Sequence, residues 1–290
     1  MSILVDENTR VIVQGITGRM AQIVATDLVK YGTTVVGGVS PGRGGQTIEG
    51  LPVFDYVADA VAATGANTTL VFVPPEGAAG ALDEAIDAGI PLIVYPGDGL
   101  PIAEAARVRR RFAPGQTMVG PNSPGLISPG KSKVGFMPSQ CYTPGSLGVI
   151  SKSGSLSYEV SLRLTEAGIG QSTVVGVGGD PVKGLSIAEA LQLFHDDDET
   201  SAVLFLGEIG GLDEYTICDY LERADAKPIT AFISGSAAPA GRKMGHASAI
   251  IGGPRETHAA KTSALAESGA SVAMSLQEIT ALVRPNASIR

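Results

Sequence analysis

The sequence predicts an α/β fold built from two open sheets of parallel strands. Short apolar runs alternate with amphipathic stretches of 10 to 15 residues along the whole chain, which is the order of repeated βα units. A length of 290 residues allows one large domain or two that each bury a core, and we expect two. Glycine is abundant, with 38 residues, as expected of a chain with many tight strand–helix turns.

The first half contains five candidate strands separated by four helical patterns. The strands are RVIVQ, TTVVGGV, TTLVFV, PLIVY and TMVG. The helical stretches are TGRMAQIVATDLVKYG, DYVADAVAATG, EGAAGALDEAIDAG and LPIAEAARVRRRF, and three of them end near a glycine, which is a common helix stop signal. This alternation predicts a Rossmann-like domain over residues 1–125.

The stretch from Gly120 to Ser146 cannot be a helix because it contains five prolines and five glycines. We interpret residues 126–146 as the connection between the domains. Residues 125–132 match the P-loop pattern GxxxxGK[ST] letter for letter. A P-loop must open a helix, however, and the glycines and prolines that follow prevent one, so we reject a triphosphate site there.

The alternation of strands and helices resumes after this segment. The strands are SLGVIS, STVVGV, SAVLFLGE, PITAFIS and ASVAM. The helices are one that starts at Ser155, followed by LSIAEALQLF, LDEYTICDYLERA, THAAKTSALAESG and SLQEITALV. This order predicts a flavodoxin-like open parallel sheet over residues 147–290.

Charge and cysteine content exclude several classes of protein. A net charge of -8 argues against a nucleic-acid partner. No apolar run reaches the length of a membrane span and the first residues lack the order of a signal peptide, so we expect a cytoplasmic chain with no membrane contact. Cys141 and Cys218 lie outside any CxxC or Cys/His cluster, so we expect two free thiols and no metal site.

The first predicted strand leads into the turn GITGRMA at residues 15–21, which opens a helix and suits phosphate. The second strand ends in SPGRGG, with Arg43 in place of the acidic residue that holds the ribose of NAD. Arginine fits a phosphorylated ribose, as in NADP or the 3′-phosphate of coenzyme A. A tight turn without a ligand and a solvated loop arginine are the alternatives.

Of the three histidines, His246 is the candidate for chemistry because it lies in a long loop of small residues after a strand. His195 ends a helix before an acidic run and His258 lies near a helix start, so we expect both to be solvated. Neighbouring strands end in the turn at residues 152–155, which suits an anion, and in Glu208, which can hold one imidazole nitrogen. A core or surface histidine, an ordinary N-cap serine and a solvent-facing glutamate are the alternatives.

These segments resemble the α subunits of succinyl-CoA synthetase (succinate–CoA ligase), in the same order and over nearly the whole chain. The matching segments are MSILVDENTRVIVQGITG, YGTTVVGGVSPGRGGQTIEGLPVF, MVGPNSPGLISPG, GVISKSGSLSYE, GIGQSTVVGVGGDPVKG, GEIGG and GRKMGHASAII. The resemblance implies a CoA-binding domain followed by a ligase domain, transient phosphorylation of His246, and Glu208 as the partner of that histidine.

The resemblance also implies positions for the substrates. CoA contacts would fall on Thr17, Gly18, Arg19, Met20, Arg43, Pro96, Gly97 and Asp98. The phosphate turn would be Ser153, Gly154 and Ser155, and the acid would contact Tyr158, Asn122 and Ser123. The implied mechanism passes a phosphoryl group from the histidine to a carboxylate, and the CoA thiol then displaces phosphate from the acyl phosphate.

The implied partner is a β subunit with an ATP-grasp domain that binds ATP or GTP with Mg²⁺, in a hetero-oligomer of the tricarboxylic acid cycle. Three segments depart from the family pattern, namely RMA at residues 19–21, YPGDG at residues 95–99, and Ser123 where the family has cysteine. The first two bear on CoA and the third on the acid, so a related acid such as malate is the alternative to succinate. A CoA-binding module without catalysis and an NADP oxidoreductase are the further hypotheses.

Overall fold

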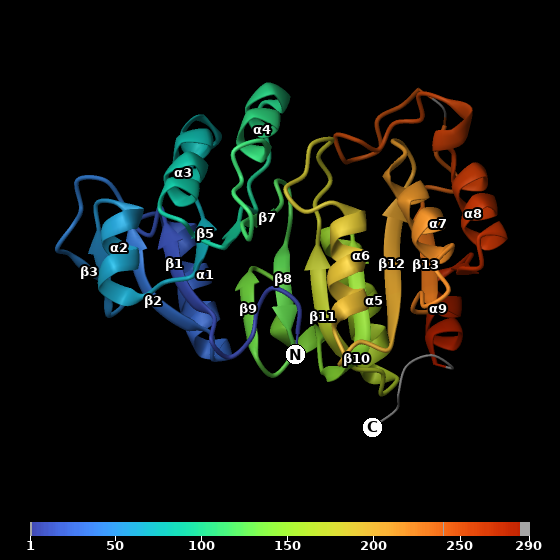
Figure 1. The fold of residues 1–290 in the computed structure, drawn as a ribbon, viewed down its shortest axis with the longest axis horizontal. Coiled ribbons are helices and arrows are strands. Elements are labelled where there is room, and N and C mark those ends of the chain that lie inside the picture. Colours follow the sequence, from blue (N-terminus) through green and yellow to red (C-terminus); the bar gives the residue numbers. More distant parts are fainter. Residues whose placement is uncertain (1, 240, 285–290) are drawn as a thin grey trace.

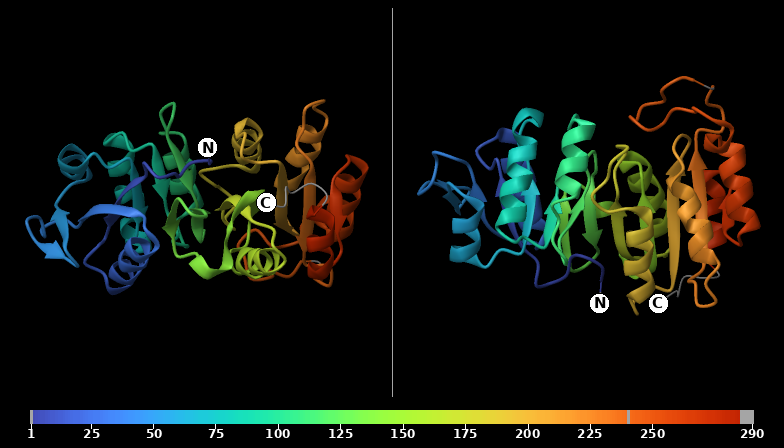
Figure 2. Two further views of the ribbon diagram at one scale, coloured as in Figure 1. Left: turned by 90° about the horizontal axis from the view of Figure 1, so that it is seen from below. Right: turned by 45° about the horizontal axis from the view of Figure 1, so that its top comes forward.

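The computed structural model describes residues 2–239 and 241–284, which form two seven-stranded sheets set side by side (Figure 1). Helices cover both faces of each sheet (Figure 2). Among the described residues, no helix is long and apolar enough to span a bilayer. Two sheets of mostly parallel strands confirm the predicted α/β fold.

The first sheet is parallel except at one edge, where β3 runs antiparallel to β4. Its order is β3-β4-β2-β1-β5-β6-β7. The strands are β1 (Arg10–Gln14), β2 (Thr34–Val39), β3 (Thr47–Ile48), β4 (Leu51–Phe54), β5 (Thr68–Val71), β6 (Leu92–Val94) and β7 (Thr117–Val119). The chain leaves β1 toward β2 on one side and returns to β5 on the other, which makes the switch point of a doubly wound sheet.

Four helices cover the first sheet, and their apolar residues show which face each one covers. They are α1 (Arg19–Tyr31), α2 (Val57–Thr64), α3 (Pro75–Asp87) and α4 (Ile102–Arg109). Leu82 of α3 and Val108 of α4 pack in one cluster with Ile12 of β1. Leu28 of α1 packs in another cluster with Val11, so α1 covers the opposite face.

In the second sheet, five parallel strands are extended at one edge by an antiparallel hairpin, in the order β14-β13-β12-β10-β11-β8-β9. The strands are β8 (Gly125–Ser128), β9 (Ser132–Gly135), β10 (Pro144–Ser151), β11 (Gln171–Gly176), β12 (Ala202–Glu208), β13 (Ile229–Ser234) and β14 (Ser271–Ala273). The helices are α5 (Gly154–Glu166), α6 (Ile187–Asp196), α7 (Thr216–Leu221), α8 (His258–Glu267) and α9 (Leu276–Val283). Short 3-10 turns are η1 (Ser139–Cys141), η2 (Asp213–Tyr215) and η3 (Pro254–Glu256).

The segment expected to be a plain connection contains the hairpin β8–β9. Leu126 pairs with Val134 within the hairpin, and Ile127 pairs with Val174 of β11. Ser132 therefore begins a strand, which agrees with the rejection of a P-loop. Gly125 permits the close pairing, because a Cβ there would lie 2.0 Å from the carbonyl oxygen of Val134.

This hairpin also ties the two halves of the chain together. The backbone N–H of Lys133 in β9 donates to the hydroxyl of Thr33 at 3.0 Å, and that hydroxyl donates to the carbonyl of Lys133 at 2.9 Å. The buried Lys133 ammonium lies 2.5 Å from Asp27 of α1. Val119 and Val177 share one continuous apolar cluster, so the two halves pack as one body.

Candidate active site

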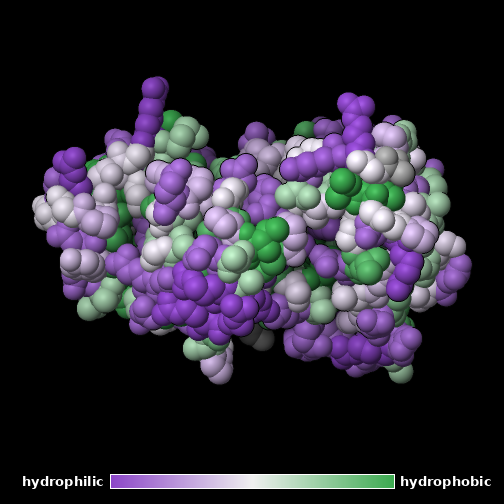
Figure 3. Space-filling model, turned by 90° about the horizontal axis from the view of Figure 1, so that it is seen from above, coloured by the Kyte–Doolittle hydropathy of each residue, from purple (hydrophilic) through white to green (hydrophobic). Residues whose placement is uncertain are grey.

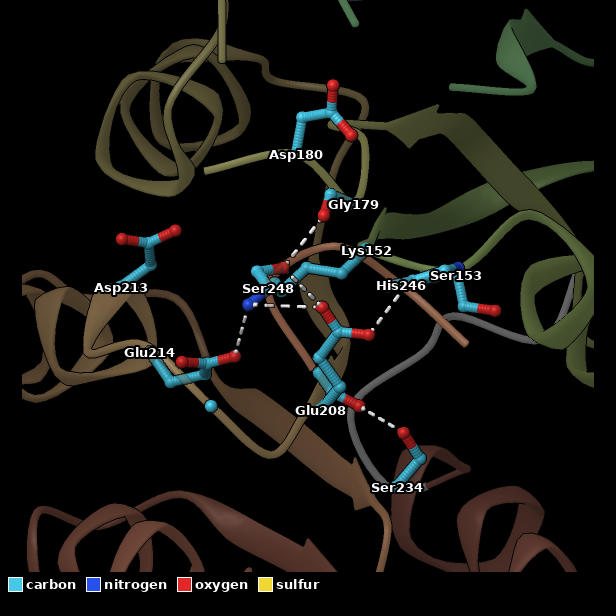
Figure 4. Close-up of polar contacts among 12 residues, drawn as sticks. Lys152, Ser153, Gly179, Asp180, Glu208, Asp213, Glu214, Ser234, His246 and Ser248 are labelled. Atoms are coloured by element: carbon cyan, nitrogen blue, oxygen red, sulfur yellow. Dashed lines mark hydrogen bonds and ion pairs between the residues drawn. The ribbon is translucent and has the colours of Figure 1, made fainter. Parts of the chain in front are cut away.

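The structure places His246 in contact with Glu208, the last residue of β12. Nδ1 of His246 lies 2.7 Å from Oε2 of Glu208 (Figure 4). The Glu208 side chain is buried, whereas that of His246 is 29 % exposed. Because Nδ1 faces the carboxylate, Nε2 on the opposite side of the ring points away from it. A histidine held in this way presents Nε2 for attack on an electrophile.

Charges and hydrogen bonds around Glu208 keep its carboxyl ionised. Burial opposes ionisation, but the hydrogen bond from His246, the nearby Lys152 ammonium and the hydroxyl of Ser248 outweigh burial and lower the pKa of Glu208. That hydroxyl lies 3.0 Å from Oε1 of Glu208. The hydrogen bond to Glu208 in turn raises the pKa of His246 above its ordinary value of 6.5, although burial acts in the opposite direction.

Three buried charged residues behind Glu208 received no role in the sequence analysis. The ammonium of Lys152 lies 3.0 Å from Glu214 and 3.5 Å from Glu208. The ammonium of Lys261 lies 2.6 Å from the other oxygen of Glu214 and donates to the carbonyl of Glu208 at 2.8 Å. Lys261 could not be recognised because a lysine in an amphipathic helical pattern is normally solvated. For Lys152, its place as the first residue of the predicted anion turn at residues 152–155 was the available signal.

The predicted phosphate turn lies at the N-terminus of α5. Ser153 is the N-cap and its hydroxyl accepts a hydrogen bond from the N–H of Leu156 at 3.4 Å, while Gly154 begins the helix. Ser155 is exposed in the first turn. Since Lys152 precedes this turn and reaches Glu208, α5 begins within the cluster that holds His246. Its first N–H groups and positive dipole end favour a bound anion there.

Asn122 connects this cluster to the first half of the chain. Its N–H donates to the carbonyl of Gly97 at 2.7 Å, and its carbonyl accepts from the N–H of Gly179 at 3.2 Å. Its side-chain amide donates to Asp180 at 3.0 Å. Gly179 lies against the catalytic candidate, because a Cβ there would be 2.8 Å from Nδ1 of His246. Asn122 thus bridges the predicted CoA turn and the histidine.

The other two predicted acid contacts lie in different surroundings. Ser123 is buried, and its hydroxyl donates to the carbonyl of Gly176 at 2.5 Å and accepts from the N–H of Gly125 at 3.0 Å. The hydroxyl of Tyr158 is buried without a hydrogen-bond partner among the described residues. Burial raises its pKa to about 12, so it is a neutral donor. It lies 3.6 Å from the position of a Cβ on Gly154, beside the anion turn.

The predicted CoA residues occupy the loops that follow β1, β2 and β6 in the first sheet, together with the first turn of α1. Gly18 is the N-cap of α1, and Arg19 and Met20 in its first turn are exposed. The hydroxyl of Thr17 lies 3.1 Å from that of Ser40, which brings the loop of the exposed Arg43 next to this turn.

The turn of residues 96–98 follows β6, and Asp98 is exposed. Gly97 packs on the ring of the buried Tyr95, where a Cβ would lie 2.6 Å from ring atoms. Together with residues 17–20 and Arg43, this turn lies at the carboxyl edge of the sheet, where open α/β sheets bind ligands.

The remaining histidine and cysteine predictions have mixed outcomes. His195 is not a solvated helix end, because its Nδ1 lies 3.2 Å from the hydroxyl of Tyr220 and its Nε2 lies 2.9 Å from Arg223. Cys141 and Cys218 are both free thiols. Within the two described ranges, no group of three His, Cys, Asp or Glu residues could hold a metal ion.

Two family models match the chain, one on each sheet. A CoA-binding domain matches residues 6–96, which covers the first sheet as far as β6. A CoA-ligase domain matches residues 150–271, which covers the anion turn, Glu208 and His246. Each predicted half therefore corresponds to a known type of domain.

A comparison with solved structures shows the same fold in a larger enzyme. ATP citrate lyase from Methanosaeta concilii superposes with a TM-score of 0.87 at 24 % identity. The superposition covers 98 % of this chain and 50 % of that chain. This chain therefore spans about half the length of the lyase, and the likeness shows the fold alone.

Curated relatives match over nearly their whole length. The succinate–CoA ligase [ADP-forming] subunit alpha 1 of Archaeoglobus fulgidus is 49 % identical, with 98 % of both chains covered. The corresponding subunit of Aquifex aeolicus is 48 % identical, with 94 % of this chain and 90 % of the relative covered. The malate–CoA ligase subunit alpha of Methylorubrum extorquens is also 48 % identical, with 94 % of each covered. This chain belongs to the family of succinate–CoA ligase alpha subunits.

Proposed function

We propose that this chain is the α subunit of an ADP-forming acid–CoA ligase that joins a dicarboxylic acid to coenzyme A through a phosphohistidine at His246. The observation that carries the proposal is the contact of 2.7 Å between Nδ1 of His246 and the buried Glu208, beside the N-terminus of α5. The family to which the chain belongs supports the same reaction.

In this mechanism, Nδ1–H of His246 donates to Glu208 and Nε2 attacks the γ-phosphorus of the nucleotide. The nucleoside diphosphate leaves with the bonding electrons, and the turn of Ser153, Gly154 and Ser155 binds the transferred phosphoryl group. The carboxylate of the acid then attacks phosphorus, and the electrons of the N–P bond return to the imidazole. The thiolate of CoA finally attacks the acyl carbon and releases phosphate.

The proposed CoA site lies at the carboxyl edge of the first sheet. The N-terminus of α1 at residues 17–20 suits the diphosphate, and Arg43 suits the 3′-phosphate of the ribose. The turn of Pro96, Gly97 and Asp98 leads through Asn122 toward the histidine loop, so the thiol end of CoA would lie near that path.

The proposed acid site lies between Asn122, Ser123 and Tyr158. Tyr158 has an unused hydroxyl that can donate to a carboxylate, and Asn122 lies next to the histidine loop. The hydroxyl proton of Ser123 is already donated to Gly176, so Ser123 shapes the pocket more than it binds. Succinate is the first candidate substrate, and the relative named malate–CoA ligase makes malate the second.

The proposed partner is a β subunit that binds the nucleotide and Mg²⁺ on an ATP-grasp domain, in a cytoplasmic hetero-oligomer. From above, hydrophobic groups gather in a few clusters near the centre and on the right half of the surface, among hydrophilic groups (Figure 3). Leu212, Met244 and Ile250, on or beside the histidine loop, are exposed apolar residues, which suits a surface that a partner covers. We also propose the domain division of residues 1–125 and 147–290, which the ranges of the two family models support, with the segment 126–146, whose hairpin extends the second sheet, between them.

The test is phosphate labelling of the chain together with its β partner. With γ-labelled ATP, we expect acid-labile, base-stable label on the wild-type chain and none on His246→Asn. The variant should keep its CoA affinity, measured by titration calorimetry, which separates lost chemistry from lost folding. Absence of label on His246 in an otherwise active pair would refute the proposal. A screen of dicarboxylic acids for thioester formation then identifies the acid.

A further inference from the structure

Four buried charged side chains from separate segments of the second half form one cluster beneath the histidine. Lys152 precedes α5, Glu208 ends β12, Glu214 lies in η2, and Lys261 lies in α8. Their side chains are 1 %, 7 %, 1 % and 0 % exposed, respectively. Two cations balance two anions, as a set of charges removed from water requires.

Lys152 is held between two carboxylates. Its ammonium lies 3.0 Å from Oε1 of Glu214 and 3.5 Å from Oε1 of Glu208, the carboxylate that contacts His246 (Figure 4). Lys261 holds the other oxygen of Glu214 at 2.6 Å and binds the carbonyls of Glu208 and Gly210 at 2.8 and 2.6 Å. Lys261 therefore fixes Glu214, and Glu214 fixes Lys152 next to Glu208.

We propose that Lys152, held by Glu214, is a positioning residue that keeps Glu208 ionised and limits protonation of His246. The inference rests on the proposed function, in which Nε2 of His246 needs a free electron pair. A buried carboxylate without a counter-cation would either take up a proton or stabilise the imidazolium. The imidazolium has no electron pair with which to attack phosphorus. Lys152 opposes both outcomes because its positive charge favours the carboxylate and disfavours a second cation next to it.

The other charged groups around His246 do not supply this effect. Glu208 and Asp180 are anions and raise the pKa of His246, whereas Lys152 lowers it. The ammonium of Lys183 is paired with Asp213 at 2.7 Å. On the histidine's own loop, Arg242 and Lys243 are exposed to solvent, where their charges are screened. Lys152 is thus a buried cation placed to act on the Glu208–His246 pair, because its ammonium lies 3.5 Å from a carboxylate oxygen of Glu208.

The test measures the pKa of His246 directly in the full chain by NMR of labelled histidine, with His246→Asn to assign the signal among three histidines. In Lys152→Met we expect that pKa to rise by about one, the size of effect that one nearby buried charge exerts. The double variant Lys152→Met/Glu214→Gln removes one charge of each sign. The buried charges then stay balanced, which guards against misfolding. In this double variant the pKa of His246 should rise by a smaller amount than in Lys152→Met. The loss of the Glu214 anion partly offsets the loss of Lys152, and the net change is still a rise because Lys152 is nearer the histidine pair. The control Lys133→Met removes an equally buried lysine from the hairpin and should leave the pKa unchanged.

An unchanged pKa of His246 in both folded Lys152 variants would overturn the inference. With the β partner present, the pH profile of histidine phosphorylation should shift to higher pH in Lys152→Met by the same amount as the pKa. The two proposals fail separately. Phosphate on His246 with an unmoved pKa refutes only the role of Lys152. A shifted pKa in a chain that never accepts phosphate refutes only the proposed function.

Discussion

Replacement of Glu208 by glutamine tests the central pair. The amide has nearly the same size and can still accept a hydrogen bond from Nδ1 of His246, so the change removes charge and little else. A hydrogen bond to a charged group contributes about 1.5–3 kcal/mol and a neutral one about 0.5–1.5 kcal/mol. Glu208→Gln therefore loses about 1–2 kcal/mol of hydrogen-bond stabilisation as the imidazole becomes positive during attack. This loss predicts phosphorylation about 5- to 30-fold slower than in the wild type.

The same substitution should move the pH dependence in a defined direction. Glu208 raises the pKa of His246, so in Glu208→Gln that pKa falls and the rise of the phosphorylation rate with pH begins at lower pH. Rapid-quench labelling with the β partner from pH 6 to 9 measures both the rate and its midpoint. Glu159→Gln removes an exposed carboxylate from α5 and should change neither. An unaltered rate and midpoint in Glu208→Gln would refute the argument.

Three further predictions follow from the same geometry. Gly179→Ala places a methyl group against Nδ1 of His246, so phosphorylation should fall at least tenfold while thermal unfolding shifts little. Arg43→Ala should weaken CoA binding about tenfold in calorimetric titrations yet leave dephospho-CoA unaffected, since only the 3′-phosphate is lost. Because the folded-state pKa of His246 is raised, its contribution to stability is complete below its ordinary pKa and is lost as pH rises through the raised value. Denaturant unfolding of wild type and His246→Asn should therefore differ most at low pH and converge at high pH.

Most of the fold could be predicted because apolar runs and helical periods alternate regularly along both halves. The hairpin β8–β9 could not, because its strands are four residues each and are separated by Pro129, Gly130 and Lys131, which resemble a loop. Its pairing depends on contacts with β11, far away in sequence, so local pattern carries no signal for it.

The site could be predicted in part. Sequence reasoning paired His246 with Glu208 because Glu208 ends one strand and His246 lies in the loop after a neighbouring strand, and the structure places them in contact. It missed Lys261 and Glu214 because both belong to segments that look solvated, and only tertiary packing buries them together. It expected a solvated His195, whereas Tyr220 covers that ring from a neighbouring segment.

The backbone hydrogen bonds at Asn122 limit how the two halves of the molecule can move relative to each other. The N–H of Asn122 donates to the carbonyl of Gly97, and the N–H of Gly179 donates to the carbonyl of Asn122, so these hydrogen bonds link the turn after β6 to the second half of the chain. A hinge rotation between the halves would have to break these hydrogen bonds, in addition to the hairpin contacts made by Lys133. If a phosphoryl group moves over any distance, the glycine-rich histidine loop or the partner subunit must then move it. The two sheets stay fixed relative to each other.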